Sequence, residues 1–265
     1  MATHTKDFGK ITTNVFENDS DYKKNAGYHN SIYRGKYLGT APTADMYSEI
    51  SAGTFGDLFI GDYFAATEDA GLKWIIAHFD YWYNIAGDNK AVHHVVIVPS
   101  TALFNHVMNS SNITTGAYVG SNFYTANDGR AAAITQINGV FGSGHIMHYN
   151  NYLQNSVTGS APVYENGQVW TDCSVELMSE IMVYGSNIFH NIQAGGSVVP
   201  SLYTVDKEQL ALFRLDHSKI TTGGSWWLRD VVSGTFFALV HGNGGASNTG
   251  ASNAYGIRPA FGIRA

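Results

Sequence analysis

Two aromatic-rich segments near the C-terminal end of the chain enclose a long run of small residues. The first reads Ser-Trp-Trp-Leu-Arg-Asp over 225–230, and the second reads Tyr-Gly-Ile-Arg-Pro-Ala-Phe-Gly-Ile-Arg over 255–264. Between them stand mainly Gly, Ala, Ser, Asn and Thr. Aromatic and aliphatic runs favour strands, whereas Gly- and Asn-rich spacers favour long connecting loops. We therefore expect two rigid strands that flank a surface segment suited to binding rather than to catalysis.

This pair of segments resembles the C-terminal signature of bacterial and phage C-type-lectin-like domains. That group includes the variable proteins of diversity-generating retroelements and tail-associated proteins of phages. Segments 55–63 and 118–121 resemble the same phage-encoded proteins, so the resemblance runs from about residue 42 to the end. It implies an α+β, C-type-lectin-like fold with an antiparallel sheet formed mainly by the C-terminal strands. The calcium-site tripeptides of animal lectins, Glu-Pro-Asn and Trp-Asn-Asp, do not occur, so calcium-dependent sugar binding is not implied.

The chain is poor in charge and rich in aromatic residues. Charged residues make up 14% of its 265 residues and the formal net charge is −6, whereas about a quarter charged is usual for globular domains. An acidic chain without a Lys or Arg cluster is not expected to bind nucleic acid. Its 16 Tyr and 29 Gly predict an uncharged, aromatic surface of the kind that antibody paratopes use. We expect neither membrane insertion nor a signal peptide, because no long apolar run is present.

Composition divides the chain in two. Residues 1–40 are polar and mixed in charge, and predict an N-terminal arm for attachment or oligomerisation, with a frayed terminus as the alternative. Residues 41–265 are predicted to form the ligand-binding domain. Helices are predicted over 44–51 (capped by Thr43), 103–108, 130–137 and 175–183 (capped by Ser174). Strands are predicted over 58–60, 73–76, 92–98, 226–231, 236–241 and 256–263, which places most strands after the helices and favours an α+β class.

The histidines do not indicate a metal site. His93 and His94 adjoin in a predicted strand and therefore point to opposite faces. His145 and His148 lie three apart, but the neighbouring glycines make a helix there unfavourable. We predict no bound metal, because the ligand spacing of zinc sites is missing.

The acidic and sulfur-containing side chains make no case for an enzyme or a cofactor. Glu176 and Glu180 would lie four apart on a predicted helix, and paired carboxylates serve glycoside hydrolysis. A solvated helix face is the favoured interpretation of that pair. Cys173 is the single cysteine, so it forms no intrachain disulfide and is expected to be a small buried side chain.

Four residues of the aromatic segments are predicted to be structural framework. Arg is costly to bury unless it is paired, yet two Arg residues stand in otherwise apolar strands. Pairing with a carboxylate or a backbone carbonyl is favoured over ligand contact, and the resemblance implies the same constant framework. These four residues are Trp226, Trp227, Arg229 and Arg258.

Residues 234–255 are predicted to form the binding face. Aromatic side chains would serve as anchors, and Asn and Ser would supply adaptable hydrogen bonds. Because alternate strand residues face opposite sides, only one of Phe236 and Phe237 is expected to be exposed. The residues predicted to form the face are Phe236, Phe237, Leu239, His241, Asn243, Ser247, Asn248, Thr249, Ser252, Asn253 and Tyr255.

The same segment contains no Lys, Glu, Gln, Met or Trp. Retroelement mutagenesis replaces adenines, chiefly in AAC codons, and the resulting codons ending in C cannot encode these amino acids. A Gly-rich loop excludes large charged residues as well. Hypervariation and an ordinary loop-like end therefore both stay open.

These observations predict a non-enzymatic receptor-binding or adhesion protein, phage-encoded and displayed on the virion. Its expected partners are a host cell-surface protein or glycan and other virion or tail proteins. A weak contact gains strength from repetition, so a homo-oligomer is expected, a trimer by resemblance to tail adhesins. The alternatives are a tail-associated glycan hydrolase and a structural tail or capsid decoration protein.

Overall fold

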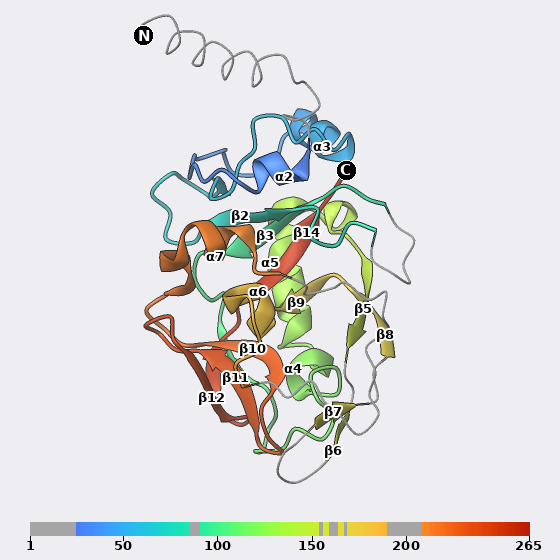
Figure 1. The fold of residues 1–265 in the computed structure, drawn as a ribbon, viewed down its shortest axis with the longest axis vertical. Coiled ribbons are helices and arrows are strands. Elements are labelled where there is room, and N and C mark those ends of the chain that lie inside the picture. The colour runs from blue at the N-terminus through green and yellow to red at the C-terminus, as the bar shows by residue number, and fades with distance from the viewer. Residues whose placement is uncertain (1–24, 85–90, 154–155, 159–163, 167–168, 190–207) are drawn as a thin grey trace, which may run out of the picture.

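The computed structural model describes residues 25–84, 91–153, 156–158, 164–166, 169–189 and 208–265. Two five-stranded sheets and two hairpins carry most of the regular structure, and short helices lie around them (Figure 1). Among the paired strands described, all pairs but one are antiparallel. The protein is thus a mixed α and β structure with mostly antiparallel sheets, which confirms the coarse α+β prediction.

The first sheet draws its strands from distant parts of the chain. Their order is β1 (Tyr63–Phe64), β2 (Trp74–Phe79), β3 (Val95–Pro99), β14 (Pro259–Ile263) and β9 (Val175–Leu177). Every residue of these strands is buried. Helices α2 (Ala26–His29) and α7 (Ala211–Leu215) pack against β2, and α5 (Arg130–Phe141) packs against β9. Burial on both faces explains why residues 92–98 read as an almost continuous apolar run.

The second sheet is built largely from the C-terminal segments. Its order is β12 (Ala246–Gly250), β11 (Phe236–Val240), β10 (Trp226–Val231), β13 (Ala254–Gly256) and β4 (Asn105–Val107). The parallel pair is β10 with β13, joined at Trp226 and Gly256. The second sheet is formed mainly by C-terminal strands, as predicted. The last C-terminal strand, β14, lies in the first sheet instead.

Two hairpins and several short helices complete the described structure. The hairpins pair β5 (Tyr149–Leu153) with β8 (Val169–Cys173) and β6 (Ser156–Thr158) with β7 (Tyr164–Asn166). The other helices are α3 (Ala44–Ser51), α4 (Asn122–Thr125), α6 (Glu180–Tyr184), and the 3-10 turns η2 (Ser143–His145) and η3 (His217–Ile220). Within the described ranges, no helix has the length and apolar character needed to cross a bilayer.

Two predicted helices are confirmed. Helix α3 spans Ala44–Ser51 with Thr43 as its N-cap, and the Thr43 side chain accepts a hydrogen bond from the Met46 backbone N–H. The helix predicted over 130–137 is α5, which extends one turn further to Phe141. The Thr43 cap was a sufficient local signal for α3, and the Ala-rich composition was sufficient for α5.

Three other elements were predicted wrongly. Residues 103–108 contain β4 rather than a helix, because residues 105–107 pair with β13. Residues 58–60 form only an isolated bridge, at Ile60. The helix predicted over 175–183 is strand β9 followed by the short helix α6, whose N-cap is Ser179 and not Ser174. At 103–108 and at 175–177 a pairing with a distant strand outweighs the local pattern.

The described part of the predicted arm packs against the domain. The side chain of Asp62 is fully buried, and its carboxylate lies 2.6 Å from Arg34 Nη2 and accepts the Lys36 backbone N–H at 2.8 Å. His29 is also completely buried. Residues 25–40 therefore belong to the folded domain, and residues 1–24 of the predicted arm lie outside the described residues.

Candidate functional site

The aromatic segment at 225–230 forms most of β10, whose residues are all buried. Trp226 and Trp227 are completely buried in β10. The indole N–H of Trp226 donates to the Ile220 carbonyl at 3.3 Å, and that of Trp227 donates to the His106 carbonyl at 2.9 Å. Buried indoles with satisfied N–H groups hold a strand firmly. These two side chains are therefore structural.

Arg258 is a fully buried cation between aromatic rings. Its guanidinium carbon lies 4.9 Å from the centre of the Trp226 ring and 5.4 Å from that of Phe213, and its Nε donates to the Pro99 carbonyl at 2.8 Å. Burial lowers its pKa to about 9, so the guanidinium stays charged at neutral pH. The predicted pairing with a backbone carbonyl is confirmed, and the rings stabilise the positive charge further.

Arg229 has the same kind of partner. Its Nη1 donates to the Leu177 carbonyl at 3.3 Å, and its backbone N–H donates to the Met178 carbonyl. The neighbouring Asp230 accepts the Glu180 backbone N–H at 2.7 Å. These bonds connect β10 to the turn between β9 and α6, so Arg229 and Asp230 act as structural links.

The predicted binding segment contains β11, β12 and β13. In β11, Phe236 is 40% exposed, whereas Phe237 is fully buried and packs edge-on against Trp227. The expectation that only one of the two Phe rings is exposed is confirmed. Leu239 is also buried, because it lies two residues after Phe237 and therefore on the same face of β11. Phe237 and Leu239 were therefore wrongly assigned to the binding face.

The other predicted face residues reach the surface. Edge strand β12 presents partly exposed small polar side chains, and the turns on either side of it are exposed. Tyr255 is half-buried and packs edge-on against Trp227 at 5.4 Å between ring centres. The residues that are exposed or partly exposed are Phe236, His241, Asn243, Ser247, Asn248, Thr249, Ser252, Asn253 and Tyr255.

Two bordering residues were missed by the sequence analysis. Asn112 Oδ1 accepts hydrogen bonds from the backbone N–H of Ser252 at 3.0 Å and from its hydroxyl at 2.8 Å. Ile113, next to it, is 52% exposed. A methyl group at Gly250 would lie 2.4 Å from Asn112 Oδ1, so this close approach requires glycine. The sequence offers no signal that the loop at 109–113 borders residues 250–253.

The turn between β11 and β12 has a defined shape. His241 N–H donates to the Gly245 carbonyl at 2.8 Å, and Gly244 takes a φ of 90°, which suits glycine. Tyr184 on α6 donates its hydroxyl to the Gly244 carbonyl at 3.1 Å. The exposed Asn243 side chain at this turn is thus held on an ordered backbone.

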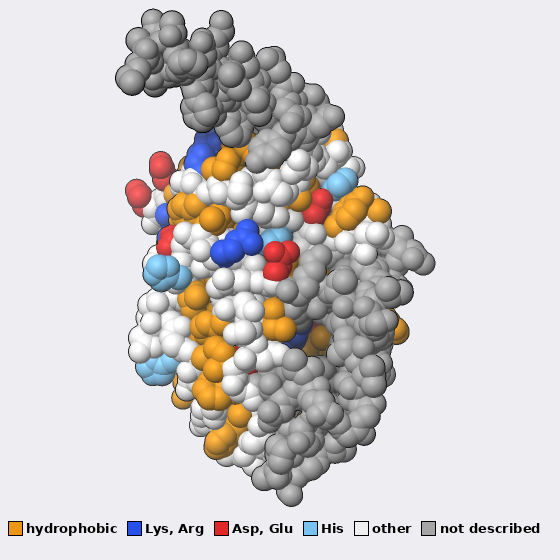
Figure 2. All heavy atoms as spheres, in the orientation of Figure 1, with side chains coloured by type: hydrophobic (Ala, Val, Ile, Leu, Met, Phe, Trp, Pro, Cys, Tyr) orange, Lys and Arg blue, Asp and Glu red, His pale blue; other side chains and the backbone are white. Residues whose placement is uncertain are grey.

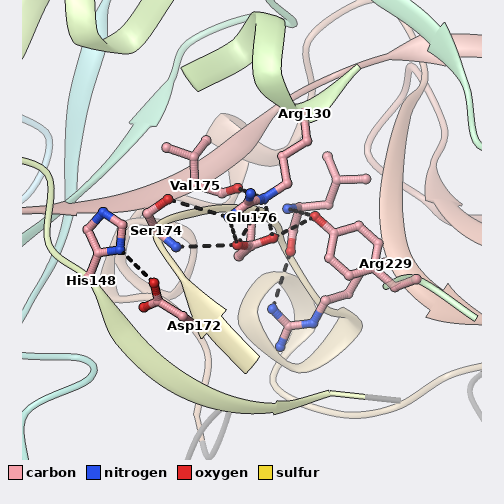
Figure 3. A network of polar contacts seen from close by, with 9 residues as sticks. Arg130, His148, Asp172, Ser174, Val175, Glu176 and Arg229 are labelled. Atoms are coloured by element: carbon pink, nitrogen blue, oxygen red, sulfur yellow. Dashed lines mark hydrogen bonds and ion pairs between the residues drawn. The ribbon is translucent and has the colours of Figure 1, made fainter. Parts of the chain in front are cut away.

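A buried polar network ties α5 to β9 (Figure 3). Arg130 Nη2 lies 2.5 Å from Glu176 Oε1, and the Glu176 side chain is only 2% exposed. Tyr118 donates its hydroxyl to Glu176 Oε2 at 2.9 Å. Burial, together with the charge of Glu176, raises the pKa of Tyr118 well above its usual value, so the phenol stays neutral. The network positions elements beneath the surface and leaves no free carboxylate oxygen for a reaction.

The paired carboxylates of the hydrolase alternative do not form a surface pair. Glu176 lies in β9 and Glu180 begins α6, so the two do not share a helical face. Glu180 is completely buried and accepts the backbone N–H groups of Ile188 at 2.8 Å and Phe189 at 3.1 Å. Neither carboxylate is placed to meet a polysaccharide.

Two cavities lie away from the predicted face. One, of about 730 Å³, has largely apolar walls, and its lining residues are Thr40, Ala41, Ala65, Ala66, Ala70, Leu72, Trp74, Gln136, Gly139 and Val140. The second, of about 190 Å³, is lined by Ser51, Ala91, Val92, His93, Arg264 and Ala265. Among the described residues, no group of three or more His, Cys, Asp or Glu side chains is arranged to hold a metal ion.

The C-terminal part of the chain matches a known family model. Residues 150–265 match a domain of unknown function, DUF6273. The matched range begins in β5 and takes in all later strands, including the whole candidate face. No curated protein and no solved structure matches the chain.

Removal of the Glu176 carboxylate is expected to destabilise the fold. Glu176→Leu leaves the Arg130 charge uncompensated in a largely buried position, so we expect a loss of about 3–5 kcal/mol in unfolding free energy. The double variant Arg130→Met with Glu176→Leu removes both charges and should lose less. Urea unfolding measures the unfolding free energy of both variants. The exposed pair His148–Asp172, 3.0 Å apart in Figure 3, supplies the control, since Asp172→Asn should cost under about 1 kcal/mol. Equal losses in all three variants would contradict this assignment.

Proposed function

We propose that this protein is a receptor-binding or adhesion protein, not an enzyme, and that its ligand is a host cell-surface protein or glycan. The contact surface is formed by the exposed residues of 234–255 on and around β12, here called the β12 face. Phe236 is its aromatic anchor. Its display on a phage virion, among other tail proteins, is part of the same proposal.

The observation that carries the proposal is the contrast between the two ends of the segment and its middle. Trp226, Trp227 and Arg258 are completely buried, whereas β12 and its turns present Asn, Ser, Thr and His to solvent. Small polar side chains beside an exposed ring resemble antibody contact surfaces. Figure 2 supports this view: side chains over β10–β12, at the lower left, are uncharged, and the Asp, Glu, Lys and Arg visible in this view lie mainly above them.

We also propose that the fold is of the C-type-lectin-like type and that the β12 face is diversified by a retroelement. The support is the sequence resemblance, together with the absence of Lys, Glu, Gln, Met and Trp between residues 234 and 255. We expect the flanking genes to include a reverse transcriptase and a template repeat that matches the codons for 234–255. Sequencing that neighbourhood checks this, and a neighbourhood without both elements counts against diversification while leaving the adhesion proposal in place.

The anchor role of Phe236 gives a direct test. Phe236→Ser removes an exposed ring from the face, and the loss of an aromatic anchor costs about 2 kcal/mol or more, or about 30-fold in affinity. The measurement is binding of the labelled full chain to cells of a bacterial strain that the unaltered protein binds. Trp170 is a matched control, because it is 42% exposed, against 40% for Phe236, and lies on the separate strand β8.

Trp170→Ser should leave cell binding within about twofold, since it lies outside the β12 face. An equal loss of cell binding in Phe236→Ser and Trp170→Ser, or no loss in either, would contradict the assignment of the β12 face as the binding surface. Release of sugar from host wall polysaccharide by the pure protein would favour the hydrolase alternative, with catalytic residues other than the buried Glu176 and Glu180. A protein that neither binds cells nor cleaves polysaccharide would favour a structural tail or decoration role.

Valency leads to a prediction about assembly. A small polar face binds weakly, and linked copies raise avidity through effective concentration without any new contact. We propose a homo-oligomer, a trimer by resemblance to tail adhesins, with residues 1–24 contributing to association. Light scattering on the full chain should give three times the chain mass of 28.8 kDa, and a chain starting at Asn25 should give a smaller species. A monomer in both cases would leave valency to the structure that carries the protein.

A further inference from the structure

Strand β12 is an open edge of the second sheet. It stands first in the strand order and pairs with β11 alone, over all five residues from Ala246 to Gly250. Figure 1 shows it at the lower left margin of the molecule, with β11 on its inner side. At such an edge, the backbone N–H and C=O groups of every second residue have no partner in their own sheet. This edge belongs to the β12 face.

Two hydrogen bonds fix the phase of the pairing between β11 and β12. Before β12, the His241 N–H donates to the Gly245 carbonyl at 2.8 Å. After β12, the Ala251 N–H donates to the Thr235 carbonyl at 2.9 Å. In an antiparallel pair, residues that exchange hydrogen bonds with the opposite strand alternate with residues that do not. Both bonds lie at odd-numbered positions, so they give the same phase.

This alternation directs the backbone groups of two residues to the open edge. Ser247 and Thr249 bond to β11, and Ala246 and Asn248 therefore turn their N–H and C=O groups away from it. Within the described part of the chain, no hydrogen bond engages these outward groups. The four residues from Ala246 to Thr249 are all partly exposed. The edge thus presents backbone donors and acceptors to solvent.

The edges of the first sheet are covered by other parts of the chain. At β1, the Tyr63 carbonyl accepts the Leu38 N–H at 2.9 Å. At β9, the Leu177 N–H donates to the Tyr118 hydroxyl at 3.1 Å, and the Leu177 carbonyl accepts from Arg229 Nη1 at 3.3 Å. In the second sheet, the edge opposite β12 is β4, which has only three residues. Strand β12 differs from β1 and β9 because no described segment covers its edge.

The sequence of β12 lacks the features that keep sheet edges from pairing. Natural sheets protect long edges with charged side chains, with proline or with a bulge. Residues 234–255 contain no Lys, Arg, Asp, Glu or Pro, and the pairing of β12 with β11 runs without a register shift. A regular, uncharged and open edge is the surface to which an extended peptide adds as a new strand.

We propose that the ligand of the β12 face is a protein, and that an extended segment of this protein pairs with β12 as an additional strand. The inference rests on the proposed function, because it names the ligand class of the same face. In this mode main-chain hydrogen bonds supply affinity, and alternate side chains supply specificity. Ala246 and Asn248 are two positions apart, about 7 Å along a strand, which is the repeat of the outward groups of any extended chain. A glycan has no backbone amides at this repeat, so the edge favours a protein ligand.

Substitution of Asn248 separates the backbone edge from the side-chain surface. Asn248→Pro removes the outward N–H and places a ring at the edge, while the bonds between β11 and β12 are kept, because proline is tolerated where the N–H faces solvent. Asn248→Ala removes the same side chain and keeps the N–H, so it is the matched control. On cells that the unaltered protein binds, the Kd should rise about tenfold or more in Asn248→Pro. In Asn248→Ala it should rise less than about threefold.

A second proline variant guards against a local effect at one position. Ala246→Pro acts at the other outward N–H and should weaken cell binding to a similar extent. Urea unfolding of each variant shows whether the fold is retained. Unchanged binding in both Asn248→Pro and Ala246→Pro would overturn the strand pairing. If Phe236→Ser loses binding at the same time, adhesion through the β12 face stands and only the mode of pairing fails.

Treatment of the cells tests the chemical class of the ligand. Proteinase digestion of the cell surface should abolish binding of the unaltered full chain, and periodate oxidation of the surface glycans should leave it. Binding that survives the proteinase and is lost after periodate would overturn the protein assignment and identify a glycan. Equal losses in Asn248→Pro and Asn248→Ala would overturn the backbone pairing in favour of a side-chain contact.

Hydrogen exchange of the unaltered full chain gives a test that needs no variant. The amides of Ala246 and Asn248 should exchange at least about tenfold faster than those of Ser247 and Thr249, because only the latter donate to β11. Slow exchange at all four amides would show that a second copy of the chain already occupies the edge. That result would overturn the proposal, because the edge would then serve assembly and not a ligand protein.

Discussion

The position of β14 between β3 and β9 is the constraint on which the rest of the structure depends. Phe261 pairs with Ile97 on one side and with Val175 on the other. This strand of five residues therefore joins β3 to β9 within the first sheet. The chain reaches β14 directly from β13 of the second sheet, through residues 257–258. Arg258 is therefore buried where the chain passes between the sheets, and its charge is stabilised by the Trp226 and Phe213 rings and by the Pro99 carbonyl.

The matched family segment contains only part of this topology. Residues 150–265 contain β14 and β9, but β1, β2 and β3 lie before residue 100. Within that segment alone, β14 would keep β9 as a neighbour and lose β3, and the second sheet would lose β4. The buried rows of β2 and β3 would then be missing from the core. The folded unit extends back to residue 25, where α2 packs against β2.

The sequence was informative where local chemistry decides the structure. The Thr43 cap and the Ala-rich stretch after Arg130 are local signals, and both helices formed as predicted. The failures share a different cause. Residues 175–183 carry an apolar stripe that suits a helix, yet Val175 and Leu177 pair with β14, more than 80 positions away. The exposure of one Phe ring at 236–237 followed from strand alternation, and the same alternation places Leu239 on the buried face with Phe237.

The β12 face can tolerate sequence change at some positions and not at others. Ser247, Asn248 and Thr249 are partly exposed on a strand that pairs with β11 alone, and substitutions at such positions usually change stability by less than about 0.5 kcal/mol. Ala251 is different: it is completely buried, and its carbonyl accepts the backbone N–H groups of Met108 and Asn109. Gly250 is restricted as well, by its close approach to Asn112. Diversification confined to Ser247, Asn248 and Thr249 would therefore alter the chemistry of the face while the backbone pairing of β12 with β11 stays unchanged.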